Sequence, residues 1–105
     1  SQPAEPEKQA AVTLVVNGSV RGDVAIKDGW NQCDVLTAAR DKGIISSLTM
    51  KYYSSLGSQG VFVIDGIGDE SMIWWVYTVN GKSVPYGCSK MTAHGGERVE
   101  WKYVK

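Results

Sequence analysis

The clearest structural signal in the chain is the stretch at residues 73–85, IWWVYTVNGKSVP. Aromatic and β-branched residues dominate its first half, and such residues suit the pleated, half-buried surface of a sheet. Asn80-Gly81 follows, a pair that readily adopts the two positive φ angles of a type I′ hairpin turn. The stretch therefore predicts a β-strand, a tight turn and the start of a second strand.

Side-chain alternation places large apolar groups on both faces of this predicted strand. One face can cover a hydrophobic core. The opposite face must be covered by another element, or it forms a surface for contact. The first face carries Ile73, Trp75, Tyr77 and Val79, and the second carries Trp74, Val76 and Thr78.

Length and charge limit the class of protein. The chain has 105 residues, enough for one modest core, and its 11 basic and 11 acidic residues give a formal net charge of zero. A balanced chain lacks the basic stripe that binds a phosphate backbone, so no nucleic-acid partner is expected. No apolar run reaches the roughly 20 residues that cross a bilayer, so membrane association would need a tether outside this chain.

Residues 1–11 are polar, contain prolines and show no periodicity. They predict a disordered leader of an exported or tethered domain, or an interdomain linker, and the folded domain is expected over residues 12–105. Its first element is a hairpin, with strands at 12–16 and 20–26 joined by the turn Asn17-Gly18. Alternation puts Val20, Val24 and Ile26 on one face, with an irregularity possible at Gly22.

A helix is predicted from about Asn31 to Lys42. Asn31 can cap the free amides of the first turn, Asp34 suits the positive end of the helix dipole, and Gly43 is a typical left-handed stop. An apolar stripe at helical spacing indicates packing on a sheet. The stripe consists of Val35, Leu36, Ala38 and Ala39.

Further strands are predicted at 48–53, at 61–64 and, most clearly, at 98–104, where Val99, Trp101 and Tyr103 alternate with charged residues. The expected fold is α+β and β-grasp-like. It is a single domain in which ββα is followed by about three further strands, with one helix packed across a mixed sheet.

The C-terminal third resembles the DUF4430 family. The resemblance rests on WWVYTVNGK at 74–82, the Gly-Cys-Ser-Lys segment at 87–90 and GGERVEWKY at 95–103. The family pattern has Tyr at the position of Trp74 and Gly-Asp in place of Gly96-Glu97. Weaker similarity at the helix and at VFVIDGIG, residues 61–68, extends the match over most of Val12 to Val104. The family is related to the C-terminal β-domain of transcobalamin and intrinsic factor.

This resemblance implies a small extracytoplasmic domain, secreted or lipid-anchored at the cell surface, without enzymatic activity or an intrinsic cofactor. In the cobalamin carriers the related domain forms one wall of a corrinoid site. The implied partner is therefore cobalamin or a related corrinoid, with a surface or transporter protein as a possible second partner. The implied ligand-binding residues are Phe62, Trp74, Val76, Pro85 and Tyr86.

The two cysteines can be related through the expected topology. First and last strands of a β-grasp sheet run parallel, so the loop before the last strand meets the start of the helix. This places Cys33 near Cys88, and a disulfide between them would contribute about 4 kcal/mol by the chain-entropy estimate and suit an exported protein. Two unpaired cysteines, or a reactive Cys33 thiol at the helix N-terminus, are the alternatives.

Catalytic and metal motifs are weak. The single histidine, His94, lies in a polar loop and is expected to be exposed, and it has no paired cysteines with which to bind zinc. A Cys88–His94 nucleophile pair lacks an orienting third group. Asp65, Asp69 and Glu70 lack the ligand spacing of a calcium loop and predict a solvated turn.

Two functions from different classes fit these observations. One is capture of a corrinoid by the aromatic hairpin face. The other is a protein–protein interaction or adhesion module that docks through the same exposed strand. Trp74→Ala separates them, because it should abolish small-molecule binding in the first case and partner binding or self-association in the second.

Overall fold

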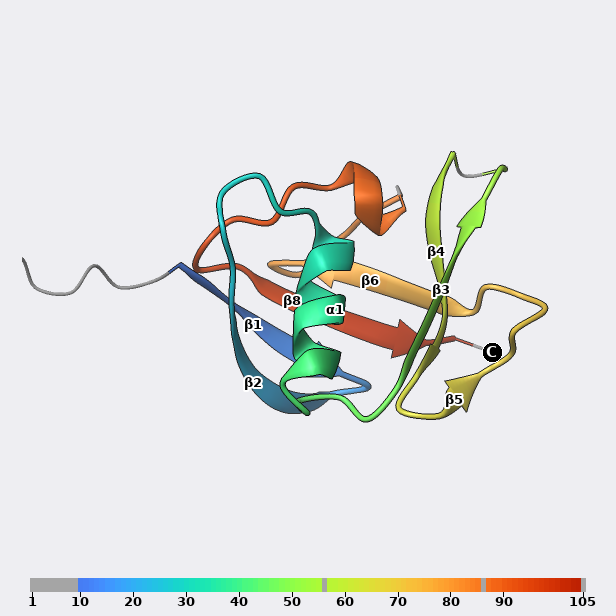
Figure 1. Cartoon of the computed structure of the whole chain (residues 1–105), viewed down its shortest axis with the longest axis horizontal. Coiled ribbons are helices and arrows are strands. Elements are labelled where there is room, and N and C mark those ends of the chain that lie inside the picture. Colours follow the sequence, from blue (N-terminus) through green and yellow to red (C-terminus); the bar gives the residue numbers. More distant parts are fainter. Residues whose placement is uncertain (1–9, 56, 86, 105) are drawn as a thin grey trace, which may run out of the picture.

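A computed structural model of the chain describes residues 10–55, 57–85 and 87–104, and one helix and two sheets make up the fold (Figure 1). The elements in chain order are β1 (Ala11–Val16), β2 (Ser19–Ala25), α1 (Gln32–Asp41), β3 (Leu48–Tyr53), β4 (Ser58–Ile64), β5 (Ile67–Gly68), β6 (Trp75–Val79), β7 (Lys82–Ser83), the short 3₁₀ helix η1 (Cys88–Lys90) and β8 (Arg98–Tyr103).

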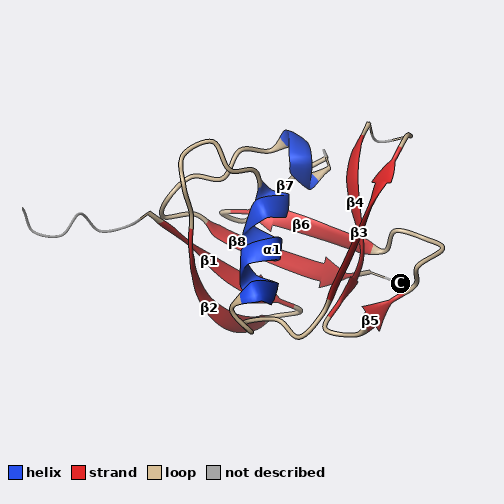
Figure 2. Ribbon diagram, viewed as in Figure 1, coloured by secondary structure: helices blue, strands red, loops and turns tan. Residues whose placement is uncertain are grey.

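The main sheet has the strand order β2-β1-β8-β6-β7. β1 and β8 run parallel at its centre, and the other neighbours are antiparallel. α1 lies across one face of this sheet, as Figure 2 shows, and the buried residues between them form the hydrophobic core. The expected α+β class, with one helix packed across a mixed sheet, is confirmed.

The middle strands differ from the expectation of one sheet. β3, β4 and β5 form a second, three-stranded sheet beside α1 and the end of β6. Both sides of β1 are occupied, one by β8 and the other by β2, and the β3–β4 hairpin does not add to the outer strands β2 and β7 of the main sheet either. The hairpin pairs with itself instead, and β4 begins at Ser58, three residues before the predicted start.

The β1–β2 hairpin contains a bulge that the alternation did not predict in full. Leu14 pairs with Gly22 and Val15 with Val20, which leaves Arg21 as the extra residue on β2. The extra residue reverses the side-chain alternation at this point. Val24 and Ile26 are both buried, but Val20 is 57 % exposed, so Val20 does not share their face as the alternation predicted.

The local signals for the helix and the turns are confirmed. The Asn31 side chain accepts a hydrogen bond from the Asp34 amide at 2.9 Å, and the Asp34 carboxylate accepts one from the Asn31 amide, also at 2.9 Å. This reciprocal pair is a capping box. At the β6–β7 turn Asn80 and Gly81 have φ angles of 51° and 82°, as a type I′ turn requires.

Candidate functional site: an apolar groove between the two sheets

A groove of about 220 Å³ lies where the second sheet meets β6, and it is called the apolar groove below. β4 forms one wall, β6 another, and the segment between β7 and η1 closes it. The lining consists of Gln59, Gly60 and Val61 from β4, Ile73 and Trp75–Tyr77 at β6, Val84, Pro85, Gly87 and Cys88 from the closing segment, and Trp101 of β8.

Aromatic rings make the floor of the groove rigid. Tyr77 stacks on Trp101 of the neighbouring strand with ring centroids 4.4 Å apart. Trp75 packs against Tyr103 at 5.3 Å, and its indole Nε1 donates a hydrogen bond to the Ile67 carbonyl oxygen at 2.9 Å. Burial raises the pKa of the Tyr77 hydroxyl above its ordinary value. The floor is therefore a low-dielectric surface that suits an apolar ligand.

Two glycines allow the walls to approach closely. A Cβ at Gly60 would collide with Cδ1 of Ile73, and a Cβ at Gly87 would collide with the Ser58 side chain. Neither glycine has a positive φ angle, so glycine is required at these positions because a side chain would not fit. Larger residues at these positions would push the walls apart or fill the groove.

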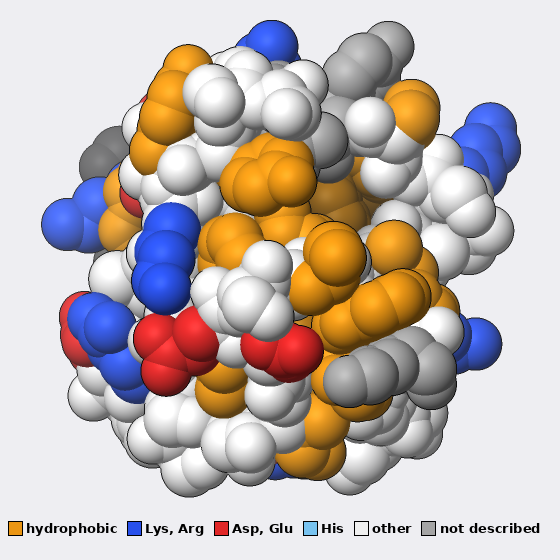
Figure 3. All heavy atoms as spheres, turned by 90° about the vertical axis from the view of Figure 1, so that its right-hand side faces the viewer, with side chains coloured by type: hydrophobic (Ala, Val, Ile, Leu, Met, Phe, Trp, Pro, Cys, Tyr) orange, Lys and Arg blue, Asp and Glu red, His pale blue; other side chains and the backbone are white. Residues whose placement is uncertain are grey.

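The groove opens on a face where hydrophobic side chains gather. Figure 3 shows them around a hollow at the end of the molecule that carries β3, β4 and β5, with acidic and basic side chains to one side. Val76 is 49 % exposed although its neighbours in β6, Trp75 and Tyr77, are buried. An apolar side chain half open to water at the mouth of a preformed groove is typical of a contact surface.

The five residues implied by the family resemblance do not all lie together. Val76 and Pro85 line the groove. Phe62 is buried behind it on β4, where the Tyr53 ring packs edge-on at 6.3 Å and Lys51 Nζ lies 5.4 Å from the ring centroid. Trp74 is half-buried just before β6 and outside the lining, and Tyr86 lies outside the described residues.

The residues on the inner side of the groove were not predicted from the sequence. Trp75 and Tyr77 were expected only to cover the core, yet both also line the groove floor, because the groove reaches beneath β6. Gly60 carried a usable signal, since an isolated glycine inside a strand pattern often marks a close approach of another segment. Ile73 and Val84 gave no signal beyond their apolar character.

The polar residues singled out in the sequence have structural roles. The side chain of His94 is 70 % exposed and lies 3.6 Å from Glu97, as an exposed loop residue would. Asp65 was predicted to lie in a solvated turn, but its side chain is only 12 % exposed and pairs with Arg21 at 2.7 Å. Within residues 10–55, 57–85 and 87–104, no group of three or more His, Cys, Asp or Glu side chains could hold a metal ion.

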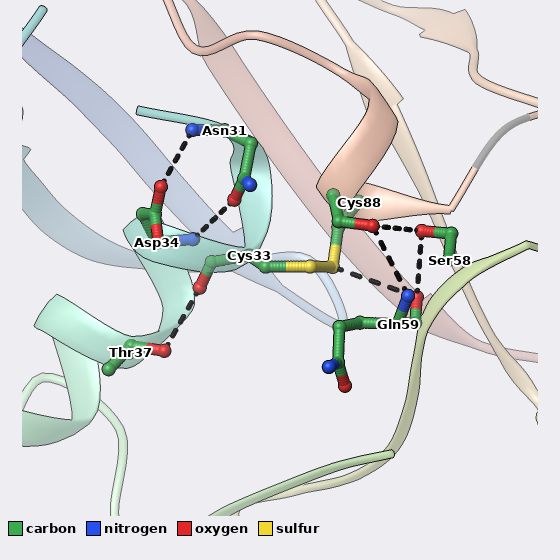
Figure 4. Close-up of a disulfide and its surroundings, with 8 residues drawn as sticks. Asn31, Cys33, Asp34, Thr37, Ser58, Gln59 and Cys88 are labelled. Carbon is green, nitrogen blue, oxygen red and sulfur yellow. Dashed lines mark hydrogen bonds between the residues drawn. A yellow bond between two sulfur atoms is a disulfide. The ribbon is translucent and has the colours of Figure 1, made fainter. Parts of the chain in front are cut away.

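The disulfide between Cys33 and Cys88, expected from the topology, joins α1 to η1 (Figure 4). Both cysteines are buried, at 6 % and 1 % exposure. η1 is also tied to β4, because the hydroxyls of Ser58 and Ser89 share a hydrogen bond and Ser89 Oγ accepts one from the Gln59 amide at 3.2 Å. The closing wall of the groove is thus fixed to both the helix and the second sheet.

The fold and the groove together define a small α+β domain with an apolar groove between its two sheets. A family model, described as a domain of unknown function (DUF4430), matches residues 34–105, and the chain belongs to this family. The family resemblance inferred from the sequence is therefore confirmed.

The solved structures that share the fold include the crystal structure of haptocorrin in complex with Cbi. The TM-score is 0.73 with 18 % sequence identity, over 96 % of this chain and 27 % of the haptocorrin chain. This chain thus spans about a quarter of the length of haptocorrin. No curated protein matches the chain. In the described part of the chain, no helix is long and apolar enough to span a membrane.

Proposed function

We propose that this domain is a non-enzymatic ligand-binding module that takes a corrinoid, such as cobalamin or cobinamide, into the apolar groove. The observation that carries the proposal is the position of Val76. It is a half-exposed valine within β6, at the mouth of a groove floored by Trp75 and Tyr77, in a fold shared with haptocorrin. The haptocorrin structure was solved with Cbi bound.

The chemistry of the groove suits such a ligand. A corrinoid is a large amphipathic ring with amide side chains, so it needs apolar walls together with backbone donors and acceptors. Apolar walls come from Val76, Pro85 and the aromatic floor, and Gln59 is a polar residue of the lining. Because the groove holds about 220 Å³, it can grip one edge of the ring. We therefore expect affinity on the order of micromolar for the isolated domain.

Calorimetric titration of the domain with cyanocobalamin and with cobinamide tests this proposal. Val76→Asp places a carboxylate where the apolar ring must pack, so affinity should fall at least about tenfold, or roughly 1.4 kcal/mol. Val20→Asp is the matched control, because Val20 is also an exposed strand valine but lies on β2, at the opposite edge of the main sheet. Its affinity should equal that of the wild type.

Heat is the preferred readout because corrinoids absorb strongly and would quench Trp fluorescence without binding. Saturable heat that is lost in Val76→Asp and kept in Val20→Asp supports corrinoid capture. Absence of heat at millimolar ligand, or equal loss in both variants, would contradict it. Trp74→Ala is a useful third variant: because Trp74 lies outside the groove lining, it should weaken binding less than Val76→Asp does.

The proposal places the domain outside the cytoplasm, secreted or held by a lipid anchor. The Cys33–Cys88 disulfide supports this location, because structural disulfides persist in oxidising compartments. A surface or transporter protein would then receive the ligand. Labelling of unreacted thiols in protein taken directly from the native host tests the location, and two free thiols per chain would contradict it.

A second candidate function is docking of a partner protein on the same face. The observation in its favour is that exposed apolar side chains continue beyond the groove lining. Tyr52 on β3 is 66 % exposed, and Met72 just before the β6 wall is 49 % exposed. This function predicts no corrinoid heat. Instead, sedimentation equilibrium should show self-association that Tyr52→Asp or Val76→Asp abolishes.

A further inference from the structure

Besides its packing in the common core, the second sheet is tied to the rest of the molecule by specific contacts near both of its ends. At its far end, Asp65 pairs with Arg21 at 2.7 Å and the Ile67 carbonyl accepts the Trp75 indole N–H at 2.9 Å. At its near end, where β4 begins, the attachments run through η1. The near end is the one that borders the apolar groove, because Gln59 and Gly60 belong to the lining.

The near attachment has a covalent and a non-covalent part, which together are called the clasp. The covalent part is the Cys33–Cys88 disulfide, which fixes η1 to α1. The non-covalent part is Ser89, whose hydroxyl contacts the Ser58 hydroxyl and accepts the Gln59 amide proton. Cys88 also contacts β4 directly, since its sulfur lies 4.0 Å from the Gln59 carbonyl oxygen. Cys88 is itself part of the groove lining.

We propose that the clasp is a redox-sensitive positioning device for the apolar groove. With the disulfide formed, η1 holds the start of β4 at a fixed distance from β6. With the disulfide reduced, η1 is held only by hydrogen bonds and packing, and the groove wall loosens while the far end of the sheet keeps its own anchors. The part of this inference that concerns ligand affinity rests on the proposed function.

The redox step is a thiol–disulfide exchange with a dithiol reductant. One thiolate of the reductant attacks a sulfur of the Cys33–Cys88 bond and forms a mixed disulfide, and its second thiol then resolves it. The S–S bond of the domain breaks and two cysteine thiols form, while the reductant becomes a disulfide. Because both cysteines are almost fully buried, attack requires η1 to lift from β4 first.

Amide hydrogen exchange tests the clasp without any ligand. The variant is Cys33→Ala with Cys88→Ala, which leaves no free thiol. The reporter is the Gln59 amide, which donates to Ser89 Oγ, and the internal control is the Asp65 amide, which donates to the Ser47 carbonyl at 3.0 Å at the far end. We expect Gln59 exchange to accelerate at least tenfold more than Asp65 exchange.

Equal acceleration of both amides, or none at Gln59, would overturn the proposal, because the disulfide would then act on the whole domain or on nothing near the groove. Ser89→Ala provides a second variant that keeps the disulfide, so it remains informative if the cysteine-free protein fails to fold. It should accelerate Gln59 exchange selectively, in the same direction and by a smaller factor. An unchanged Gln59 amide in Ser89→Ala would also overturn the clasp.

Cobinamide titration of the cysteine-free variant then measures the effect on binding. The expected result is an affinity at least tenfold below that of the oxidised wild type, with the Asp65 amide still protected. Equal affinity in the two proteins would overturn the link between the clasp and the groove. If the wild type itself gives no heat, the proposed function fails, while the exchange experiment still decides whether the clasp exists.

Discussion

At the scale of single residues, Tyr77 makes the groove floor sensitive to high pH. Burial raises the pKa of its hydroxyl above the ordinary value of about 10, so the folded state favours the neutral form. The contribution of the neutral Tyr77 hydroxyl to the free energy of unfolding is complete below a pH of about 10. It is lost as the pH rises above that value, with a slope of up to about 1.4 kcal/mol per pH unit. Urea unfolding at several alkaline pH values should show this fall in the free energy of unfolding.

Tyr77→Phe should remove that contribution to the slope, because phenylalanine cannot ionise. Tyr52→Phe is the matched control, since it makes the same substitution at a tyrosine that is 66 % exposed. If both variants kept the wild-type slope, the alkaline loss of stability would have to come from another group.

The Arg21–Asp65 pair is a second prediction at this scale. Asp65 accepts a hydrogen bond from the Ser46 amide at 2.7 Å and forms an ion pair with Arg21 at 2.7 Å, and its side chain is only 12 % exposed. Asp65→Asn keeps the shape and tolerates the φ angle of 56° but loses the charge, so the free energy of unfolding should fall by about 1–3 kcal/mol.

Lys51–Glu70 offers the matched comparison for this pair. Its atoms are 3.4 Å apart, but the side chains are 49 % and 68 % exposed. Exposed pairs of this kind contribute little, so Glu70→Gln should cost less than about 0.5 kcal/mol. Equal losses in the two variants, measured by urea unfolding, would show that burial does not distinguish them.

At the scale of elements, the two Asn-Gly turns hold both ends of β8. Asn17 Oδ1 accepts the Tyr103 amide proton at 2.9 Å, and Asn80 Oδ1 accepts the Arg98 amide proton at 2.9 Å. Asn80→Gly keeps the φ angle of 51° accessible, removes the side-chain hydrogen bond and gives the unfolded chain more freedom, so we expect a loss of about 1–2 kcal/mol. Asn80→Ala adds backbone strain and should cost about 2–3 kcal/mol.

Thermal unfolding of Asn80→Gly and Asn80→Ala separates the two contributions, and the same pair at Asn17 repeats the test at the other end of β8. A glycine variant as unstable as the alanine variant would mean that the side-chain hydrogen bond carries the whole effect. The opposite result, a glycine variant as stable as the wild type, would mean that the bond to β8 contributes nothing.

These turns also show why part of the fold was predictable. Asn31, Asn80 and Gly81 act on neighbours within a few residues, so their signals are complete in the local sequence. The second sheet depends instead on which strands pair with one another, which no local window contains. The bulge at Arg21 exposed Val20 for the same reason, because the pairing between two strands places it there.

The candidate site was predictable only where it lies on the outer face of β6. Alternation identified Val76 as uncovered, and the family resemblance added Pro85. Phe62 was predicted to bind ligand, and the structure places it outside the groove lining, beside Tyr53 and Lys51; this placement depends on how β3 pairs with β4. The groove itself arises between two sheets, and its closing wall depends on a covalent link between residues 55 positions apart.

At the scale of the whole molecule, that covalent link is a large part of the stability. A disulfide over 55 positions restricts the unfolded chain and contributes about 4 kcal/mol by the chain-entropy estimate, against a typical total of about 5–15 kcal/mol. The cysteine-free variant should therefore remain folded at room temperature but unfold at much lower urea concentration than the wild type. Urea unfolding followed by Trp fluorescence, without reductant, measures the difference.

Tryptophan fluorescence is a suitable probe for this experiment, and the cysteine-free variant treated with a dithiol is its control. Trp75 and Trp101 both contact the core and the groove, so their fluorescence reports the main sheet. Wild type treated with a dithiol should shift toward the cysteine-free variant, whereas the cysteine-free variant should not respond to the dithiol. A loss well below about 1 kcal/mol would show that η1 and the helix are already restrained relative to each other in the unfolded chain, because only then would closing the loop cost so little entropy.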